Sequence, residues 1–314
     1  MRTITVALGE KTYNIEIAAG LLDQIGAKAR VLSQAVKAAI ISDSNVDPLY
    51  GERLERSLAA SGFEVTRIVF AAGEQSKNLT VLGQVYDELA RAGLTRSDLI
   101  LTLGGGVPGD LGGFAAATFL RGIDFIQVPT SLLAQIDSSV GGKVAIDLPS
   151  GKNLAGSFYQ PKAVFIDPDL LKTLPLRFLH DGLAEAIKYG CIRDAGLFAQ
   201  IAAVKSDQEL LEQADIIIET CCNIKARIVE KDEFDTGERM LLNFGHTIGH
   251  AIEKCCGFTT YTHGEGVGIG MVQMTRQTEK LGLTAAGTAE ELSRVLKKFA
   301  LPVSAVFDLS LIHI

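Results

Sequence analysis

The chain has 314 residues, of which 47% are hydrophobic, and it carries a formal net charge of −7 at pH 7. This length suggests two domains, and the apolar fraction is enough for a substantial core. The acidic balance, without any basic run, argues against non-specific binding to nucleic acid.

The sequence also indicates the cellular compartment of the protein. No uninterrupted apolar run approaches the roughly 18 residues that span a bilayer, and the opening MRTITVALGEKTYNIEI lacks an apolar signal core and predicts two strands. The five cysteines include no CxxC pair, which makes a poor disulfide framework and predicts free thiols. We therefore expect a cytoplasmic protein without a membrane partner.

Strand and helix signals alternate through the first half of the chain. Apolar runs at residues 36–42, 63–70, 98–105 and 124–130 predict buried strands. Between them, helical stretches lie near Pro48–Ala60 and Leu79–Ala92, and the second is followed by Gly93, a typical residue after a helix end. This alternation predicts a mostly parallel, doubly wound sheet.

The pattern changes after Asp167–Pro175, where strand signals nearly vanish. Helical periodicity then covers residues 183–190, 207–231, 239–250, 267–281 and 289–299. We place the domain boundary near Leu174, which predicts an α/β domain at 1–174 and an all-α domain at 175–308.

A glycine-rich turn, LTLGGGVPGDLGGF at residues 101–114, follows a predicted strand and opens a helix. Three consecutive glycines remove every Cβ, so that backbone N–H groups can approach a phosphate, and the helix dipole favours the anion. The turn is not GxGxxG, and it lacks the GK[ST] of a P-loop. It points to a dinucleotide pyrophosphate, with a tight turn for close packing as the alternative.

Three other residues of the first half suit an anionic ligand. Asp43 ends a predicted strand, where a carboxylate either accepts hydrogen bonds from ribose hydroxyls or caps a turn. Lys143 follows Gly142 and Lys152 follows Gly151. Backbone exposed by glycine beside an ammonium group favours phosphate or carboxylate, although a surface lysine is often only solvated.

Three of the five histidines lie within eighteen residues: His246, His250 and His263. Imidazole is the commonest side-chain metal ligand, and a spacing of four puts His246 and His250 on one helix face. Arg239 and Asn243 are expected to precede them on the same helix. The cluster is interpreted as a metal site, with helix-face histidines hydrogen-bonded to their neighbours as the alternative.

Glu185 and Lys188 lie in LAEAIKYG, an otherwise apolar helical segment. A carboxylate in this position is either a metal ligand or a surface residue beside the apolar stripe, and the pattern leaves both open.

Six segments together resemble the 3-dehydroquinate synthases, a family of the sugar phosphate cyclase superfamily. They are GGGVPGDLGGF, RGIDFIQVPTSLLAQIDSSVGGK, GKNLAGSFYQP, LAEAIKYG, LLNFGHTIGHAIE and HGEGV, and the match runs from about Asp43 to Pro302. In combination they are far more specific than one glycine loop. The resemblance implies a Rossmann-like N-terminal domain, a helical C-terminal domain and an active site in the cleft between them.

The resemblance also implies the activity of a lyase that depends on NAD and zinc, with cobalt as an alternative metal. Such enzymes convert 3-deoxy-D-arabino-heptulosonate 7-phosphate to 3-dehydroquinate and phosphate, a step of the shikimate pathway to chorismate and the aromatic amino acids. NAD transiently oxidises a ring hydroxyl, phosphate is eliminated with the substrate's own phosphate as a base, the ketone is reduced back, and an aldol step closes the new ring. A homodimer is the family expectation.

By matching position, the resemblance assigns zinc to Glu185, His246 and His263, which leaves positions open for substrate oxygens. His250 becomes a substrate contact and proton-transfer group. The positions matched to the substrate pocket are Arg121, Asp137, Lys143, Lys152, Asn153, Lys188, Lys225, Arg239 and Asn243. The positions matched to NAD are Asp43, Asn45, Glu74, Lys77, Gly105, Gly106, Val107, Asp110, Thr130, Ser131, Lys143, Lys152 and Thr173.

Two features depart from the family pattern. Pro108 removes one backbone donor from the glycine loop, so the pyrophosphate is expected to rely on neighbouring N–H groups. Family members continue past the point reached at Phe307 with an Asp-Lys-Lys motif, one lysine of which reaches the substrate, whereas this chain ends in LSLIHI.

The transposase end sequence CTGTCTCTTATACACATC encodes this hexapeptide. We therefore hypothesise that Leu309–Ile314 is a non-native, adapter-encoded tail and that the native C-terminal segment is missing. Such a chain is expected to bind NAD and metal but to turn over poorly.

Three alternatives remain open. Another sugar phosphate cyclase would share the fold, NAD and zinc, although Asn243 and His250 match the dehydroquinate pattern. A metal-dependent polyol dehydrogenase of the glycerol dehydrogenase type would release NADH in net turnover and would need fewer cations for phosphate and carboxylate. A non-catalytic protein that keeps the fold for binding is the third, through the missing C-terminal segment.

Overall fold

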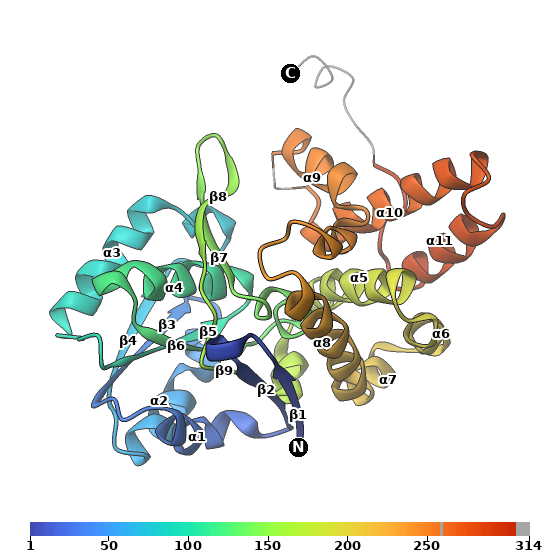
Figure 1. Cartoon of the computed structure of the whole chain (residues 1–314). Helices are drawn as coiled ribbons and strands as arrows, with labels where there is room; N and C mark the ends of the chain where they lie inside the picture. Colours follow the sequence, from blue (N-terminus) through green and yellow to red (C-terminus); the bar gives the residue numbers. More distant parts are fainter. Residues whose placement is uncertain (258–259, 306–314) are drawn as a thin grey trace. The chain divides into compact units, whose positions relative to one another are not determined.

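The computed structural model in Figure 1 describes residues 1–257 and 260–305. By contacts between residues, the chain divides into two units. The first contains Met1–Thr173 and Ala214–Phe234, and the second contains Leu174–Gln213 and the described residues from Asp235 onward.

The first unit is built on a seven-stranded sheet in the order β1-β2-β9-β6-β5-β3-β4. Its strands are β1 (Arg2–Val6), β2 (Tyr13–Ile17), β3 (Lys37–Asp43), β4 (Glu64–Phe70), β5 (Leu99–Gly104), β6 (Asp124–Pro129) and β9 (Ala163–Ile166). Only β1 and β2 pair antiparallel, and the other neighbours are parallel. β7 (Lys143–Leu148) and β8 (Gly151–Phe158) form a separate antiparallel hairpin.

Helices cover both faces of this sheet (Figure 1). Those of the first unit are α1 (Ile25–Leu32), α2 (Glu52–Ala60), α3 (Leu79–Arg91), α4 (Gly106–Thr118) and α8 (Ala214–Lys231). Short 3-10 or π turns are η1 (Gly9–Lys11), η2 (Leu21–Gln24), η3 (Asp47–Gly51), η4 (Glu74–Ser76), η5 (Phe119–Arg121), η6 (Ala134–Ser138) and η7 (Pro168–Thr173). The arrangement is the predicted Rossmann-like, mostly parallel sheet.

Successive residues of the central strands explain the two layers. In β3, Ala38 and Ile40 pack with α1 and α2 in one apolar cluster, whereas Ala39 and Ile41 pack with α3 and α4 in another. Because side chains alternate between the faces of a strand, a strand covered on both faces is apolar along most of its length. This requirement produced the continuous apolar runs by which β3, β5 and β6 were predicted.

The helix α8 belongs to the first unit, although the predicted division assigned all of 175–308 to the second domain. Arg2 of β1 forms ion pairs with Asp215 and Glu219 of α8, and the N–H of Ala7 donates to Glu230 Oε1 at 2.8 Å. Helical periodicity identifies a helix but does not reveal its packing partner. The domain limits therefore stay a prediction.

The second unit is helical in its described residues. Its elements are α5 (Leu176–Ile192), α6 (Ala195–Ala203), α7 (Asp207–Glu212), η8 (Glu238–Asn243), α9 (His246–Cys255), α10 (His263–Lys280) and α11 (Thr288–Lys298). Residues 181–190 of α5 are all buried, which makes this helix the centre of the unit.

The predicted helix from Arg239 through the histidines is wrong. Arg239 and Asn243 lie on the 3-10 turn η8, and α9 begins only at His246. Gly245 separates the two with a left-handed φ of 83°, which a helix does not contain, and a Cβ there would lie 2.6 Å from the carbonyl oxygen of Val267. In addition, His263 opens α10, whereas the periodicity indicated a start at Val267.

Other predictions have simpler outcomes. The five cysteines lie in the described part of the chain and form no disulfide there. Within 1–257 and 260–305, no helix combines the length and apolar character needed to cross a bilayer. The predicted tail Leu309–Ile314 lies outside the described residues.

Asp98 joins the starts of β3 and β5 and gives a pH-dependent test of this fold. Its oxygens accept hydrogen bonds from Lys37 N at 2.9 Å and from the N–H and hydroxyl of Thr95 at 2.7 and 2.8 Å. Burial alone would raise the pKa of Asp98, but these hydrogen bonds and the charge of Lys37 lower it below its ordinary value of 3.8.

Asp98→Asn should therefore lower the free energy of unfolding by about 1–3 kcal/mol at neutral pH. Because the folded-state pKa is depressed, the stabilisation is complete above the ordinary pKa and is lost as the pH falls through the folded value. Urea unfolding at pH 7 and at a series of pH values falling from 3.8 measures this, with the exposed Asp87→Asn as control. A deficit that stays constant down to the lowest pH at which the chain folds would contradict the assignment.

Candidate functional site

The helices α9 and α10 approach each other closely through glycines. A Cβ added to Gly249 would lie 2.9 Å from the carbonyl carbon of Gly266, and one added to Gly270 would lie 2.0 Å from the carbonyl oxygen of Gly245. Only glycine permits such close backbones. The crossing brings the first residues of the two helices together, and the rings of His246 and His263 lie 5.1 Å apart between centroids.

The start of α10 is fixed by hydrogen bonds on both sides of His263. Thr262 and Glu265 form a capping box, in which Thr262 N donates to Glu265 Oε2 at 2.9 Å. The N–H of Gly264 donates to Oδ1 of the buried Asp181 of α5 at 2.6 Å. The position of His263 is thus fixed through both of its neighbours, one of which is bonded to α5.

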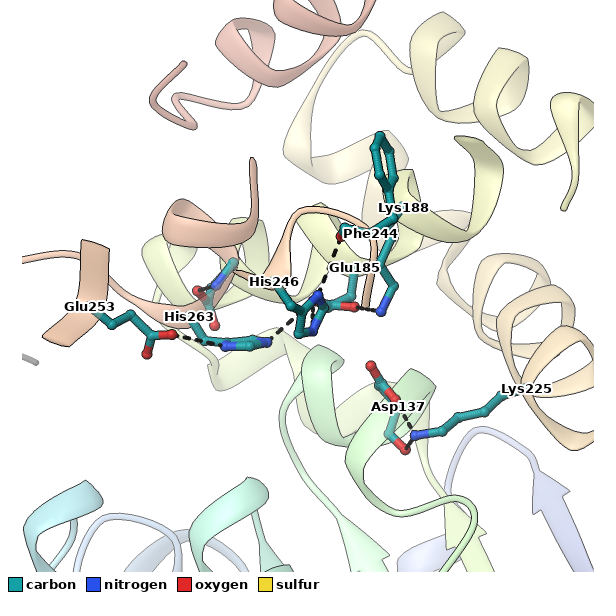
Figure 2. A network of polar contacts seen from close by, with 10 residues as sticks. Asp137, Glu185, Lys188, Lys225, Phe244, His246, Glu253 and His263 are labelled. Atoms are coloured by element: carbon teal, nitrogen blue, oxygen red, sulfur yellow. Dashed lines mark hydrogen bonds and ion pairs between the residues drawn. The ribbon is translucent and has the colours of Figure 1, made fainter. Parts of the chain in front are cut away.

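Glu185 projects from α5 toward these histidines (Figure 2). Its side chain is fully buried. Oε2 forms an ion pair with Lys188 one turn further along the helix, whereas Oε1 lies 3.3 Å from His263 Nε2 and 3.6 Å from His246 Nε2. The candidate ligand atoms of Glu185, His246 and His263 all lie within 4.8 Å of one another.

The charge state of this cluster suits a cation. Burial alone would raise the pKa of Glu185, but Lys188, His246 and His263 hold it well below its usual range, so the carboxylate is ionised. Its Oε1 accepts no hydrogen bond of good geometry from the described residues. A buried anionic oxygen facing two imidazole nitrogens is the donor set of a catalytic zinc site, so the residues fit a divalent metal ion.

Each candidate histidine ligand has a partner for its other nitrogen. His246 Nδ1 lies 3.3 Å from the carbonyl oxygen of Phe244, and His263 Nδ1 lies 3.4 Å from Oε2 of Glu253. Such partners fix the tautomer that leaves Nε2 free to bind a metal. His250 is exposed, with its ring centroid 5.4 Å from that of His246 and 5.8 Å from that of His263.

In the first unit, the glycine-rich turn connects β5 to α4 as predicted. A Cβ on Gly112 would lie 2.6 Å from Thr102 Cγ2, and one on Gly109 would lie 2.9 Å from Gln127 Oε1, so these glycines serve close packing of α4 on the sheet. Gly105 and Gly106 begin the helix instead, and their added Cβ atoms would meet only the side chains of Ser131 and Ser138, with the hydroxyl oxygens at 3.3 and 3.6 Å. The backbone N–H groups at this helix start are suited to an anion.

Several residues matched to NAD gather near α4. Lys77 is 4% exposed, and its Nζ lies 2.7 Å from Asp110 Oδ2 and 3.6 Å from Glu74 Oε1. Burial alone would lower the pKa of Lys77, but Asp110 and Glu74 raise it, so the ammonium is charged. Lys152 Nζ lies 3.7 Å from Glu74 Oε1.

The hairpin between β7 and β8 extends this polar group through Asp147, which was not among the predicted site residues. Its N–H donates to Lys77 O at 2.7 Å, and its Oδ1 accepts from Asn153 N at 2.8 Å. The Gly-Lys pairs of this region indicated an anion site. The hairpin of residues 143–158 was not predicted, because small polar residues obscure its alternating pattern.

Three of the residues matched to NAD make hydrogen bonds within the first unit. Asp43 Oδ1 accepts hydrogen bonds from Asn45 N at 2.8 Å and Val46 N at 3.0 Å, so it caps the turn after β3. Thr173 hydrogen-bonds the hydroxyl of Tyr50. Thr130 N donates to Gly104 O at 2.9 Å, which holds the loop after β6 against the glycine turn.

The residues matched to the substrate pocket are divided between the units. Arg121, Asp137, Lys143, Lys152, Asn153 and Lys225 lie in the first, and Lys188, Arg239, Asn243 and His250 lie in the second. Within the first unit, Lys225 of α8 forms an ion pair with Asp137 of η6 and also donates to its carbonyl oxygen at 2.6 Å (Figure 2). Arg239 is buried, whereas Arg121, Lys143 and Asn243 are exposed.

Asp181 and Glu253 were not predicted from the sequence either. Both are buried carboxylates that contact His263 or its neighbour. The T-x-x-E pattern of Thr262 and Glu265 is a readable sign of a helix start and would have placed His263 in the first turn of α10.

A Rossmann-like unit together with a helical unit that carries a Glu/His/His cluster agrees with the class of sugar phosphate cyclases. Models of the 3-dehydroquinate synthase N-terminal and C-terminal regions match residues 67–181 and 182–312. The chain belongs to the 3-dehydroquinate synthase family.

Curated relatives agree with this assignment. The 3-dehydroquinate synthase of Clostridium acetobutylicum is 55% identical over 302 residues, which cover 96% of this chain and 85% of that protein. The 3-dehydroquinate synthase of Enterococcus faecalis is 50% identical over 96% of this chain and 84% of that protein.

Solved structures with this fold include other cyclases. A 2-deoxy-scyllo-inosose synthase complexed with carbaglucose-6-phosphate, NAD+ and Co2+ is 27% identical with a TM-score of 0.89, over 99% of this chain and 86% of that one. The 2-epi-5-epi-valiolone synthase of Streptomyces hygroscopicus, with NAD+ and Zn2+ bound, is 28% identical with a TM-score of 0.87, over 98% and 86%. A probable glycerol dehydrogenase of Sinorhizobium meliloti, at 17% identity and a TM-score of 0.65 over 95% and 83%, shares the fold alone.

The glycine crossing of α9 and α10 gives a test of the site's support. Gly270→Ala should lower the free energy of unfolding by about 1–3 kcal/mol and weaken zinc binding, because α9 must move away and take His246 with it. Thermal unfolding and zinc titration measure both effects.

Gly83→Ala in α3 is the matched control, since nothing lies within 4 Å of the added Cβ. It should leave stability unchanged or raise it by up to about 1 kcal/mol. Parent-like stability and zinc affinity in Gly270→Ala would refute the packing argument.

Proposed function

We propose that this chain converts 3-deoxy-D-arabino-heptulosonate 7-phosphate to 3-dehydroquinate and phosphate, the reaction of the family to which it belongs. The observation that carries the proposal is identity of 50–55% to curated 3-dehydroquinate synthases over 96% of the chain. The cluster of Glu185, His246 and His263 supports it, because it offers the donor atoms that a catalytic metal needs.

The metal would be held by Glu185, His246 and His263, with Zn2+ or Co2+ as the ion. Either ion, when bound, supplies a Lewis acid that polarises a substrate hydroxyl and stabilises its alkoxide. Lys188 keeps Oε2 of Glu185 paired, so that Oε1 is directed toward the two imidazoles.

NAD would be held by the first unit. When bound, NAD supplies a transient oxidation of a substrate hydroxyl, which acidifies the neighbouring C–H. Reversal of this oxidation leaves no net redox change. The N–H groups at the start of α4 would hold the pyrophosphate, and Asp43 and the group around Lys77 would hold the rest of the dinucleotide. Because Asp43 Oδ1 already accepts two backbone hydrogen bonds, Oδ2 is the oxygen offered to ribose.

Lysine and arginine side chains would bind the anionic groups of the substrate. His250 would transfer protons to and from it. In the first unit, Lys152 and Lys225 are the proposed cations for an anionic substrate group, and Asp137 orients Lys225. In the second unit, the proposed cations are Lys188 and Arg239. His250 is exposed beside the two candidate ligands and accepts or returns a proton at a substrate hydroxyl.

The alternatives are less well supported. The cyclases of other sugars match at 27–28% identity, about half the value for the 3-dehydroquinate synthases, and the glycerol dehydrogenase shares the fold alone. A homodimer in the cytoplasm remains a prediction of the family, which light scattering and fractionation would test.

The activity is tested by incubating the chain with NAD, Zn2+ and the heptulosonate phosphate. We expect phosphate and 3-dehydroquinate in equal amounts, without net absorbance from NADH. Net NADH without phosphate would identify a polyol dehydrogenase, and phosphate with a different cyclised product would identify another cyclase.

Two histidine variants separate metal binding from proton transfer. His250→Ala should retain its metal and lower kcat by about 10²- to 10⁴-fold, whereas His263→Ala should lose both the metal and turnover. Metal content after dialysis and phosphate-release rates measure the two effects. Loss of metal from His250→Ala would instead make His250 a ligand.

A further inference from the structure

Glu253 is a buried carboxylate that has no part in the proposed reaction. It lies near the end of α9, one turn after His250, and is 3% exposed. Carboxylates are rarely buried unless they are paired, because loss of hydration is costly. Its position near the candidate metal ligands therefore needs a physical reason.

The ring of His263 lies between two carboxylates (Figure 2). Its Nε2 is 3.3 Å from Oε1 of Glu185, and its Nδ1 is 3.4 Å from Oε2 of Glu253. A neutral imidazole has one N–H and one lone pair. With a metal in the Glu185 cluster, the lone pair must be on Nε2, and Nδ1–H must then be the donor that faces Glu253.

We propose that Glu253 is a positioning residue for the metal site: it accepts the Nδ1–H of His263, fixes the tautomer and ring orientation, and so increases metal affinity. The proposal rests on the metal site proposed above. A carboxylate behind a ligating histidine also makes the imidazole a stronger donor, and removing such a partner typically weakens metal binding by about 10- to 100-fold.

The two histidine ligands are supported unequally. His246 Nδ1 faces the neutral carbonyl oxygen of Phe244, which belongs to the backbone and cannot be removed by substitution. His263 faces a full charge on a side chain. The effect of Glu253 on the affinity of the site should therefore act through His263.

A competing role for Glu253 is direct ligation. The candidate ligand atoms of His250, Glu253 and His263 also lie within 4.8 Å of one another. The Nδ1 of His263 cannot both donate to Glu253 and bind a metal beside it, so the two roles exclude each other. They differ in what the loss of His250 does to metal binding.

The test measures Zn2+ affinity by competition with a chelator for the parent chain, Glu253→Ala, Glu253→Gln and His250→Ala. We expect one ion per chain throughout, an affinity about 10- to 100-fold lower in Glu253→Ala, and an intermediate value in Glu253→Gln, whose amide oxygen still accepts a hydrogen bond. His250→Ala should bind as the parent does. Glu290→Gln, which removes an exposed carboxylate from α11, is the control for charge and should also bind as the parent does.

A second readout separates positioning from a general loss of structure. With Co2+ in place of Zn2+, the visible absorption band of Glu253→Ala should shift relative to the parent, while circular dichroism of the metal-free chains stays the same. If Glu253→Ala does not fold, Glu253→Gln carries the comparison. The intermediate affinity of this conservative variant is the expected partial rescue.

Three outcomes would overturn the proposal in distinguishable ways. Parent-like affinity in both Glu253 variants would show that the carboxylate does not act through His263. A loss of affinity in His250→Ala as large as in Glu253→Ala would make Glu253 a ligand. No metal binding by the parent chain would overturn the proposed metal site itself, and with it this inference.

Discussion

The second unit depends on the buried charge of Glu185. An uncompensated carboxylate at this depth would cost several kcal/mol, so its surroundings must supply positive charge or a cation. Lys188 supplies part of it from the same helix, and the histidines at the starts of α9 and α10 supply the rest. The glycine crossing of α9 and α10 and the capping of α10 by Asp181 and the Thr262–Glu265 box can be understood as the means of holding two imidazoles against one buried oxygen.

The first unit obeys a different constraint, which is close packing. Strands covered on both faces are mostly apolar, and the polar pair of Thr102 and Gln127 in β5 and β6 is buried with its members hydrogen-bonded to each other. The polar groups of the proposed nucleotide site lie where β3, β5 and β6 end. Small residues in α4 let that helix lie directly on β5 and β6, and its first turn presents backbone N–H groups at the same edge. The geometry of the glycine turn thus serves the core and the proposed nucleotide site together.

Six of the seven strands of the sheet could be predicted from the sequence, because a short continuous apolar run between turn residues is typical of a buried strand. The strand β9, between β2 and β6, was missed. Less could be predicted where local periodicity conflicts with a backbone requirement. The helix assumed from Arg239 is interrupted at Gly245, whose left-handed conformation accompanies close contact with α10, a segment further along the chain. The packing partner of α8 and the burial of Glu253 were equally hidden. A carboxylate on an amphipathic helix usually faces solvent, and only tertiary structure reveals the exception.

The pairing of Lys188 with Oε2 of Glu185 also limits which ions this site can accept. With that oxygen held by an ammonium group, Glu185 offers a metal one oxygen and cannot chelate it with two. The protein then presents two nitrogens and a single oxygen. Calcium requires six to eight oxygens and magnesium an octahedron of oxygens, so both are disfavoured by the donor set, although they are abundant in cells. In the proposed metal site, the lysine would therefore contribute to metal selectivity without touching the metal.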